Sequence, residues 1–294
     1  MTSLKIMSFN ILGDAPIWKT KYEHIKKEDF IYWDYRKELI IDIINKQNPD
    51  ICVLCEVQHD TILFFSKYCT DNNYGYIYTS ADPNKPEESL KKYKNYNHTN
   101  NSGNLIIFKL DKVRLINNTA PDYVNYFTRK ANKYDWNKEK LEEYIKPAVS
   151  NIVQFEINAD NKRFYFTGLH HPHILKEEIP NEYIEFLLKK INKINDINNL
   201  PVIVCGDFNS IPSSTLYKIM ETNKYESSYK LINKKENKYT IANDNFKNCV
   251  DYIFIKNCTV TSVKPIDEEY LKNNIIPNKD FPSDHMFLVA TIKI

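Results

Sequence analysis

The chain has 294 residues, of which 42% are hydrophobic, 27% charged and 13% aromatic, and this composition excludes full-length disorder, collagen and coiled coil. Forty Lys and Arg residues against 38 Asp and Glu residues leave a formal net charge of +2. Such a balance argues against wholesale binding of nucleic acid or an anionic membrane through bulk charge. Any binding to a polyanion must therefore be local.

Six cysteines in so long a chain do not make a disulfide scaffold, and most of them lie in apolar runs typical of buried strands. The N-terminal segment has no charged region leading into a long apolar stretch, and no run approaches the roughly 18 apolar residues of a membrane span. We therefore expect the protein in the cytoplasm, with the nucleus as the alternative, and we expect no membrane partner.

Short apolar runs rich in β-branched residues alternate with longer segments of helical periodicity along the chain. Strands are expected at 5–9, 51–56, 75–78, 104–108, 150–157, 163–169, 202–205, 249–255, 260–263 and 286–292. Helices are expected at 33–46, 59–68, 182–194 and 213–220, with Asn181 and Ser213 as N-caps of the last two. This order predicts a mixed α/β domain in which sheets pack between helices, with no linker between independent domains.

Two segments, 81–102 and 117–146, look like loops or insertions. The second carries several cations among Tyr and Trp residues, namely Arg129, Lys130, Lys133, Lys138 and Lys140. Basic residues interleaved with aromatic residues suit a phosphate backbone with stackable bases. A solvated, mobile loop explains the same composition equally well.

Polar side chains follow several predicted strands, at the points where a sheet scaffold gathers functional groups. Asp207 and Asn209 come directly after the apolar run at 202–205, and in extended chain they project to the same side. A carboxylate beside an amide can orient a water molecule near a phosphate. The alternative is an Asx-turn that ends the strand.

Glu56 interrupts an otherwise apolar strand, and a lone buried carboxylate is costly unless it is paired or bound to a metal. Hard cations such as Mg²⁺ take carboxylate oxygen and keep several waters, so one such Glu can seat the ion. The same Glu could also reach solvent at the end of the strand.

Near the C-terminus, Asp284 could lie near the water shell of a metal and His285 at a phosphate oxygen, or both could belong to a turn before an edge strand.

Asp251 opens an apolar strand and could fix the tautomer of a His. Of the three His residues at 170, 171 and 173, one catalytic His fits better than a zinc site, because a fourth ligand and a supporting motif are missing. Asn10 ends the first strand and could orient a ligand or start a turn.

No serine-nucleophile, P-loop, dinucleotide-binding or Cys–His template fits the sequence. What is left is a metal-assisted site directed at phosphate.

Six segments, in this order and at this spacing, resemble the endonuclease/exonuclease/phosphatase superfamily. They are S-F-N-I-L at 8–12, P-D-I-C-V-L-C-E-V at 49–57, T-G-L-H at 167–170, G-D-F-N-S at 206–210, V-D-Y-I-F at 250–254 and P-S-D-H at 282–285. Each motif alone is weak evidence for this superfamily, but the ordered set of six is specific to it. The resemblance implies a four-layered α/β-sandwich, with two stacked mixed β-sheets flanked by helices, in a single catalytic domain over residues 1–294. It also implies Mg²⁺-dependent hydrolysis of phosphate esters, with Mn²⁺ as the alternative metal.

The same resemblance assigns roles to residues of this sequence. It implies that Glu56 binds the metal with support from Asn10, and that Asp284 assists. It implies that Asp207 activates or positions the nucleophilic water and that Asn209 orients the phosphate. It also implies that His285, paired with Asp251, contacts the scissile phosphate, and that His170 contacts the phosphate or the leaving group.

Further details are similar to the deadenylase branch of this superfamily, which includes the yeast carbon catabolite repressor type, nocturnin, Angel and 2′-phosphodiesterase. They are W-D-Y-R at 33–36, Y-T at 239–240 followed by Asp251, and I-P-N at 276–278. This resemblance implies an RNA 3′-exonuclease of deadenylase type that prefers RNA over DNA. Phe246 falls where that branch stacks an adenine. Asn104 and His171, the latter as an alternative register of His170, are also expected to bind substrate.

Other functions remain open at this point. The same scaffold could serve as a DNA endonuclease acting at abasic sites, a 2′-phosphodiesterase or a nucleotide phosphatase. A non-catalytic nucleic-acid-binding module is the alternative from another class, although Glu56, Asp207, Asn209 and His285 are all present. No protein-recruitment domain is evident in the sequence.

Overall fold

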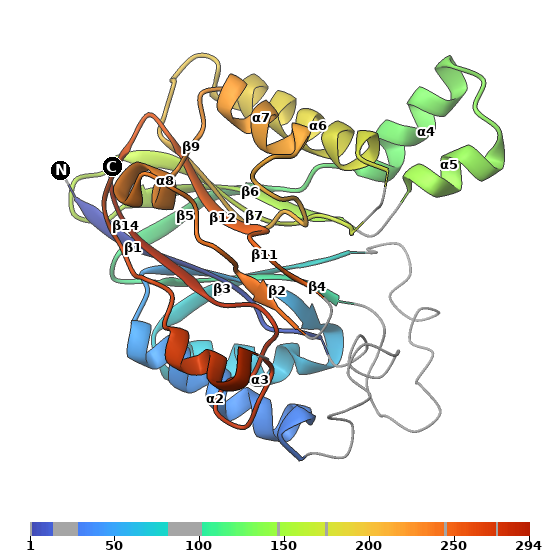
Figure 1. The fold of residues 1–294 in the computed structure, drawn as a ribbon. Coiled ribbons are helices and arrows are strands. Elements are labelled where there is room, and N and C mark those ends of the chain that lie inside the picture. Colours follow the sequence, from blue (N-terminus) through green and yellow to red (C-terminus); the bar gives the residue numbers. More distant parts are fainter. Residues whose placement is uncertain are drawn as a thin grey trace.

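Two six-stranded β-sheets stack against each other and helices cover the outer face of each, so that the molecule has four layers (Figure 1). This computed structural model describes residues 2–13, 29–81, 102–145, 148–173, 176–243, 246–274 and 276–294, and all structural statements below refer to them. Of the predicted loop 81–102, only Ala81 and Ser102 are among the described residues. The α/β-sandwich expected from the sequence is confirmed.

The first sheet has the strand order β13-β14-β1-β2-β4-β3, and only β1 and β2 run parallel. Its strands are β1 (Ser3–Asn10), β2 (Ile51–Gln58), β3 (Tyr74–Ser80), β4 (Ser102–Lys109), β13 (Thr259–Val263) and β14 (Leu288–Lys293). Helices α2 (Trp33–Gln47) and α3 (Ile62–Asp71) pack on its outer face (Figure 1). Short 3-10 helices lie at Asp29–Ile31, His59–Thr61 and Glu268–Asn274.

The second sheet has the order β5-β6-β7-β8-β12-β9, with only β7 and β8 parallel. Its strands are β5 (Val113–Thr119), β6 (Val149–Ile157), β7 (Arg163–His170), β8 (Val202–Asp207), β9 (Glu226–Ser227) and β12 (Asp251–Lys256). Helices α6 (Glu178–Asn195) and α7 (Thr215–Thr222) cover its outer face. A short helix, α8 (Ser228–Asn233), follows β9, and β10 (Ile241–Ala242) and β11 (Lys247–Asn248) form a separate two-stranded ribbon. Among the described helices, none is long and apolar enough to cross a membrane.

The space between the sheets is filled by apolar side chains that alternate along the strands of both. Val53 and Ile106 come from the first sheet, and Phe155 and Phe166 from the second. Gly168 permits the close approach of the two layers, since a Cβ at this position would lie 2.6 Å from a methyl carbon of Val53. The sheets can therefore bring residues of distant strands within contact distance.

Each of the ten predicted strands overlaps an observed one, but the predicted loop at 117–146 is wrong. This segment continues β5 and then forms helices α4 (Tyr123–Lys133) and α5 (Lys138–Tyr144). The aromatic residues that suggested a nucleic-acid loop include Tyr123 and Tyr144, which are buried together with Phe127 against α6. Strand β5 and the short elements α8, β9, β10 and β11 were not predicted, because most of them have too few residues to show a periodicity.

The predicted helix starts were also wrong in detail. Helix α7 is capped by Ser214, whose hydroxyl accepts the N–H of Tyr217 at 3.2 Å, and not by Ser213. Helix α6 begins at Glu178, so Asn181 lies inside it. Pro180 is tolerated there because the first turn of a helix needs no backbone donor to an earlier turn. The predicted helix at 59–68 is divided into a 3-10 turn and α3.

Arg36 ties together three segments that are far apart in the sequence. It lies in α2 with a side chain that is fully buried, and its guanidinium donates to the carbonyls of Ile31, Ile11 and Pro282 at 3.1, 2.7 and 3.1 Å. Ile11 follows β1 and Pro282 precedes β14. A buried charge is tolerated only when it is hydrogen-bonded in this way. The helix therefore fixes the two loops that leave the edge of the first sheet.

We expect that Arg36→Met lowers the free energy of unfolding by about 3 kcal/mol, because the substitution leaves three carbonyls without a donor. Urea unfolding followed by circular dichroism measures this value. Arg129→Met, at an exposed position of α4, is the matched control and should cost less than about 0.5 kcal/mol. A loss below about 1 kcal/mol for Arg36→Met would show that these bonds are dispensable.

Candidate active site

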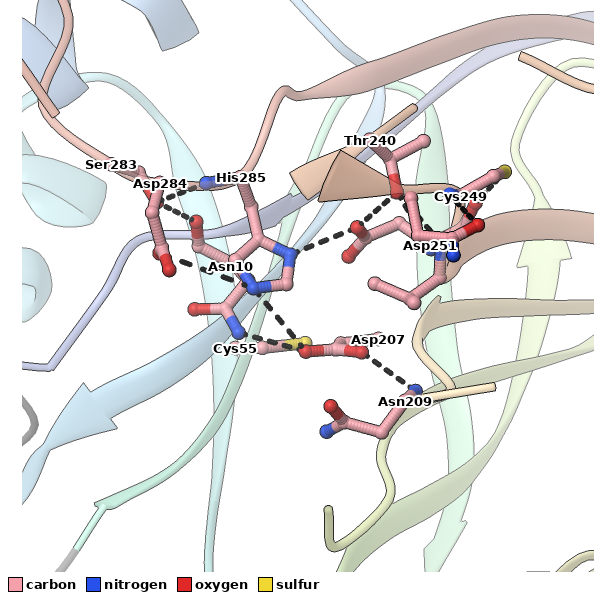
Figure 2. A network of polar contacts seen from close by, with 12 residues as sticks. Asn10, Cys55, Asp207, Asn209, Thr240, Cys249, Asp251, Ser283, Asp284 and His285 are labelled. Atoms are coloured by element: carbon pink, nitrogen blue, oxygen red, sulfur yellow. Dashed lines mark hydrogen bonds and ion pairs between the residues drawn. The ribbon is translucent and has the colours of Figure 1, made fainter. Parts of the chain in front are cut away.

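Side chains from both sheets meet at the edge where β1, β2, β7 and β8 end and β12 begins. In the second sheet, His170 lies opposite Asp207 across β7 and β8, and Asp207 lies opposite Asp251 across β8 and β12. Asn10, the last residue of β1, reaches the same group from the first sheet (Figure 2). Residues that are 197 positions apart in the chain are thus in direct contact.

Glu56 reaches the site through a β-bulge. The pairing of β2 with β4 shifts register between Leu54 and Val57, and Glu56 has a φ of 63°. Regular alternation would turn Glu56 to the face of Leu54, which packs under the helices α2 and α3. The bulge turns it instead toward the open edge, at the cost of a backbone conformation that is unfavourable for a residue with a side chain.

The amide of Asn10 bridges the two carboxylates. Its Nδ2 donates to Oε1 of Glu56 at 2.9 Å and to Oδ2 of Asp207 at 3.0 Å, while its Oδ1 accepts the N–H of Leu12 at 3.0 Å. The orientation of the amide follows from its surroundings, because only the nitrogen can satisfy two carboxylates. Asn10 is 1% exposed, so its position is fixed by these bonds.

Glu56 is held in its charged form. Burial alone would raise its pKa, but the pKa is lowered because His170, the amide of Asn10 and the N–H of Gly13 favour the carboxylate. The Gly13 N–H donates to Oε2 at 2.8 Å. The Nε2 atom of His170 lies 3.9 Å from Glu56 Oε1 and 3.7 Å from Asp207 Oδ2. This imidazole therefore faces both carboxylates.

Asp207 and Asn209 are fixed by the chain that leaves β8. The N–H of Asn209 donates to Asp207 Oδ1 at 2.8 Å (Figure 2). The Asn209 amide donates to the carbonyl of His171 at 2.7 Å. Gly206 has a φ of 143°, and a Cβ there would lie 1.8 Å from the carbonyl oxygen of Leu169. Only glycine permits this approach of β7 to β8, which sets Asp207 beside His170.

Asp251, His285 and Thr240 form a buried chain of hydrogen bonds (Figure 2). Nδ1 of His285 lies 2.9 Å from Asp251 Oδ2, and the Thr240 hydroxyl donates to the same oxygen at 2.6 Å. The Thr240 oxygen accepts the N–H groups of Val250 and Asp251, both at 2.9 Å. Nε2 of His285 points to the other side, 3.7 Å from Asp207 Oδ2.

His285 carries a positive charge near neutral pH. Burial would lower its pKa, but the carboxylates of Asp251, Asp284 and Asp207 raise the pKa well above the usual value. Burial raises the pKa of Asp251 to about 6, while His285 opposes that rise. The pair is therefore an ion pair at neutral pH, and the Nε2–H of His285 is a donor directed toward Asp207.

The loop before β14 is fixed on both sides. The Ser283 hydroxyl donates to the carbonyl of Asn10 at 2.6 Å and accepts the N–H of His285 at 3.1 Å. Asp284 is 5% exposed, and its Oδ1 lies 4.0 Å from Nε2 of His285. The N–H of Ala242 donates to the carbonyl of Asp284, which joins this loop to β10.

The three residues expected to bind substrate lie in different environments. Phe246 is 41% exposed, and its backbone joins Asn243 in the turn between β10 and β11, next to the loop of His285. Asn104 is fully buried on the face of β4 that looks between the sheets, opposite Thr79. His171 is also fully buried, with its ring beside Tyr183 and Phe208 and no partner at either ring nitrogen. The structure brings Phe246 to the rim of the site but not Asn104 or His171.

Three further residues support the site without having been singled out from the sequence. Thr240 positions Asp251, and Ser283 joins β1 to the loop of His285. Arg36 holds the chain after β1 and the chain before β14. Each lies inside a motif that the sequence shows, namely Y-T, P-S-D-H and W-D-Y-R. The motifs mark the segments, but only the three-dimensional contacts reveal which side chain acts on which.

Among the described residues, two groups of side chains could hold a metal ion, and both include Asp207. In each of them, Glu56–His170–Asp207 and Asp207–Asp251–His285, the potential ligand atoms lie within 4.8 Å of one another. The second group is already occupied by the ion pair of Asp251 and His285. The first offers two carboxylates, the donors that hard divalent cations prefer, so its chemistry fits such an ion.

Comparison with known proteins agrees with this geometry. Residues 7–285 match the Endonuclease/Exonuclease/phosphatase family, and the chain belongs to that family. The match begins within β1 and ends at His285, so it spans all the residues that meet at the site.

Two curated relatives are similar in sequence. The CCR4-Not complex 3′-5′-exoribonuclease subunit Ccr4 of Candida albicans is 26% identical over 308 residues, which cover 90% of this chain and 38% of that protein. Nocturnin of Rattus norvegicus is 25% identical over 305 residues, which cover 98% of this chain and 65% of that protein. The chain thus spans less than half the length of this Ccr4.

Two solved structures share the fold. The human Nocturnin catalytic domain with a bound sulfate anion has a TM-score of 0.74 at 22% identity, covering 99% of this chain and 94% of that one. ANGEL2, a 2′,3′-cyclic phosphatase in complex with adenosine-2′,3′-vanadate, has a TM-score of 0.75 at 16% identity, covering 99% and 96%. At this level of identity the likeness establishes the fold.

The buried ring of His171 makes stability sensitive to acid. Burial, with a smaller effect of His170, lowers the pKa of His171 to about 3. The unfolded chain takes up a proton near pH 6.5 and the folded chain does not, so stability falls as the pH drops from about 6.5 toward 3. We expect that His171→Leu does not show this loss. Below pH 6 its free energy of unfolding should therefore rise relative to that of wild type by up to about 1.4 kcal/mol per pH unit.

Urea unfolding at pH 7, 6 and 5 measures this gain. His173→Leu, at an exposed position in the same segment, controls for removal of an imidazole. Equal pH dependence of wild type and His171→Leu would place the ring in contact with solvent.

Proposed function

We propose that the protein is a metal-dependent phosphodiesterase, and that it acts as an RNA 3′-exonuclease of deadenylase type. One observation carries the proposal. The amide of Asn10 bridges the carboxylates of Glu56 and Asp207, and the imidazoles of His170 and His285 both face Asp207 Oδ2. Two carboxylates that can accept protons and two imidazoles that can contact a phosphate thus lie together at one edge of the sheets.

In this proposal Glu56 is the principal ligand of Mg²⁺, with Mn²⁺ as the alternative ion. Asn10 orients the Glu56 carboxylate, and Asp284 assists from the loop before β14. The bound ion would neutralise negative charge on the phosphate in the transition state. Carboxylate oxygens and few protein ligands are typical of magnesium sites that complete their coordination with water and substrate phosphate.

The remaining catalytic roles belong to side chains of the protein. A carboxylate oxygen of Asp207 accepts a proton from the attacking water, whose oxygen bonds to phosphorus in line with the leaving 3′ oxygen. The bond from phosphorus to that 3′ oxygen breaks, and the leaving oxygen takes a proton from solvent. The Nε2–H of His285 donates to a non-bridging oxygen, and Asp251 stabilises the imidazolium. Asn209 and His170 orient the phosphate, and the products are a nucleoside 5′-monophosphate and an RNA shorter by one nucleotide.

Two observations favour RNA as the substrate, and the preference for adenylate follows from the resemblance to deadenylases. The ring of Phe246 is exposed beside the loop of His285, where it could stack on a base. The relatives Ccr4 and Nocturnin match nearly the whole of this chain, and Ccr4 is named a 3′-5′-exoribonuclease. A nucleic-acid substrate, a cytoplasmic or nuclear location and a single catalytic domain over residues 1–294 remain predictions of this proposal.

A substrate panel tests the proposed function. We expect the protein with Mg²⁺ to degrade adenylate RNA from its 3′ end faster than abasic duplex DNA, 2′,5′-oligoadenylate or dinucleotides. Asp207→Ala should lower the rate about 10²- to 10⁴-fold, because it removes the proton acceptor. Asp196→Ala, on an exposed side chain at the end of α6, is the matched control and should act like wild type.

Each other outcome points to another function. Equal or faster cleavage of abasic DNA would reject the deadenylase assignment while keeping the phosphodiesterase. A preference for 2′,5′-oligoadenylate or for nucleotides would favour a 2′-phosphodiesterase or a nucleotide phosphatase. Binding of RNA without hydrolysis of any substrate would show that the protein is a non-catalytic binding module.

A further inference from the structure

Helices α4 and α5 form a hairpin that is a packed part of the fold. Its core consists of buried aromatic and aliphatic side chains from α4, α5 and α6, namely Tyr123, Phe127, Tyr144, Ile179 and Tyr183. Tyr126 stacks on Phe186 of α6, with ring centroids 4.1 Å apart. The ion pair of Lys130 with Glu182 adds a further contact to α6. The hairpin therefore holds its surface side chains in a defined place.

The base of this hairpin is joined to the residues of the active site. The hydroxyl of Tyr183 donates to the carbonyl of Tyr144 at 2.7 Å, and the Tyr183 ring lies 6.2 Å from that of His171. The carbonyl of His171 in turn accepts the amide of Asn209. Strand β6, which follows α5, starts at Val149 opposite His170. Figure 1 shows the hairpin standing at the same end of the sheet as these strand ends.

The surface of the hairpin is cationic along α4. This helix contains Arg129, Lys130 and Lys133 and no acidic residue. Arg129 and Lys133 are both exposed and four residues apart, so they lie on one face. Across the turn, the Lys140 ammonium lies 4.7 Å from the ring centre of Trp136, and that of Lys133 lies 5.2 Å from the ring centre of Tyr134.

The hairpin as a whole has no net charge, since residues 122–145 carry five acidic and five basic side chains, but two of the acidic ones are paired with lysines other than those proposed to bind RNA. Glu142 pairs with Lys138, and Glu143 pairs with Lys176. Asp135 and Glu139 are exposed near the turn between the helices. Arg129, Lys133 and Lys140 have no carboxylate partner among the described residues, so three cations remain available to a polyanion.

We propose that Arg129, Lys133 and Lys140 form an exosite that binds the phosphates of single-stranded RNA on the 5′ side of the scissile bond. This inference rests on the proposed function, since the strand that enters the active site must continue past the rim. Cations interleaved with aromatic rings are typical of surfaces that bind single strands without reading their sequence. At about 1.5 Å per residue, Arg129 and Lys133 lie about 6 Å apart along α4, which matches about two stacked nucleotides.

The exosite predicts that affinity grows with RNA length. We expect a 20-nucleotide adenylate RNA to bind at least about tenfold more tightly than a trinucleotide, measured by fluorescence anisotropy in EDTA so that no hydrolysis occurs. The variant Arg129→Ser/Lys133→Ser/Lys140→Ser should lose most of this gain. Its plot of log affinity against log salt concentration should be less steep by about 2, because each single-strand phosphate contact contributes about 0.7. Trinucleotide binding should not change.

Two variants control for charge and for side-chain identity. Lys46→Ser/Lys67→Ser/Lys112→Ser removes the same charge from exposed positions on α2, on α3 and beyond the far end of β4, and should keep the length dependence. Arg129→Lys/Lys133→Arg/Lys140→Arg keeps the cations and should also keep it. Equal melting temperatures of all variants would confirm that the exposed substitutions leave the fold intact.

The outcomes separate this inference from the proposed function. An unchanged salt slope in the hairpin variant, or an equal loss in the control variant, would overturn the exosite, whatever the enzyme hydrolyses. In that case the cationic face would bind a different polyanion, such as an acidic protein. A loss of RNA affinity in the hairpin variant together with no hydrolysis by wild type would keep the exosite and reject the nuclease.

Discussion

The structure depends on two carboxylates from different sheets that are held a few ångströms apart by one amide. Glu56 and Asp207 repel each other, and the Nδ2 of Asn10 donates to both. Asn10 can do so because β1 ends beside the bulge of β2 and because the sheets approach closely at Gly168. The pKa of Glu56 nevertheless stays below its usual value, so the site keeps its negative charge. Such a site attracts a divalent cation, and through it a phosphate.

Much of the surrounding structure keeps this edge in place. Arg36 fixes the chain after β1 and before β14, and Ser283 connects those same two segments directly. Thr240 holds Asp251, which holds His285 in its charged form. These contacts are buried, so they act as rigid supports for a site whose reacting groups must be positioned within fractions of an ångström. The site is thus supported from the helical layer of the first sheet and from the separate ribbon of β10 and β11.

The sequence predicted the segments of the site better than their geometry. Asp207, Asp251 and His285 could be found because polar residues at the ends of apolar strands are conspicuous, and the order of the motifs identified the family. The bulge at Glu56 could not be found, since strand alternation alone places this side chain on the helical face. His170 and His171 differ only by register, and the pairing of β7 with β8 decides which one faces the carboxylates. The hairpin of α4 and α5 was mistaken for a loop because its aromatic residues pack on α6, a contact that no local pattern reveals.

The central claim is that residues from the first strand to the last converge on one divalent cation. Anomalous diffraction from crystals soaked in Mn²⁺ tests it most directly, because the position of the ion is then observed independently of any reaction. We expect one peak within about 2.5 Å of a Glu56 carboxylate oxygen, on the side that faces Asp207, and we expect this peak to disappear in Glu56→Gln crystals. A peak elsewhere, or a peak of equal height in Glu56→Gln, would contradict the account.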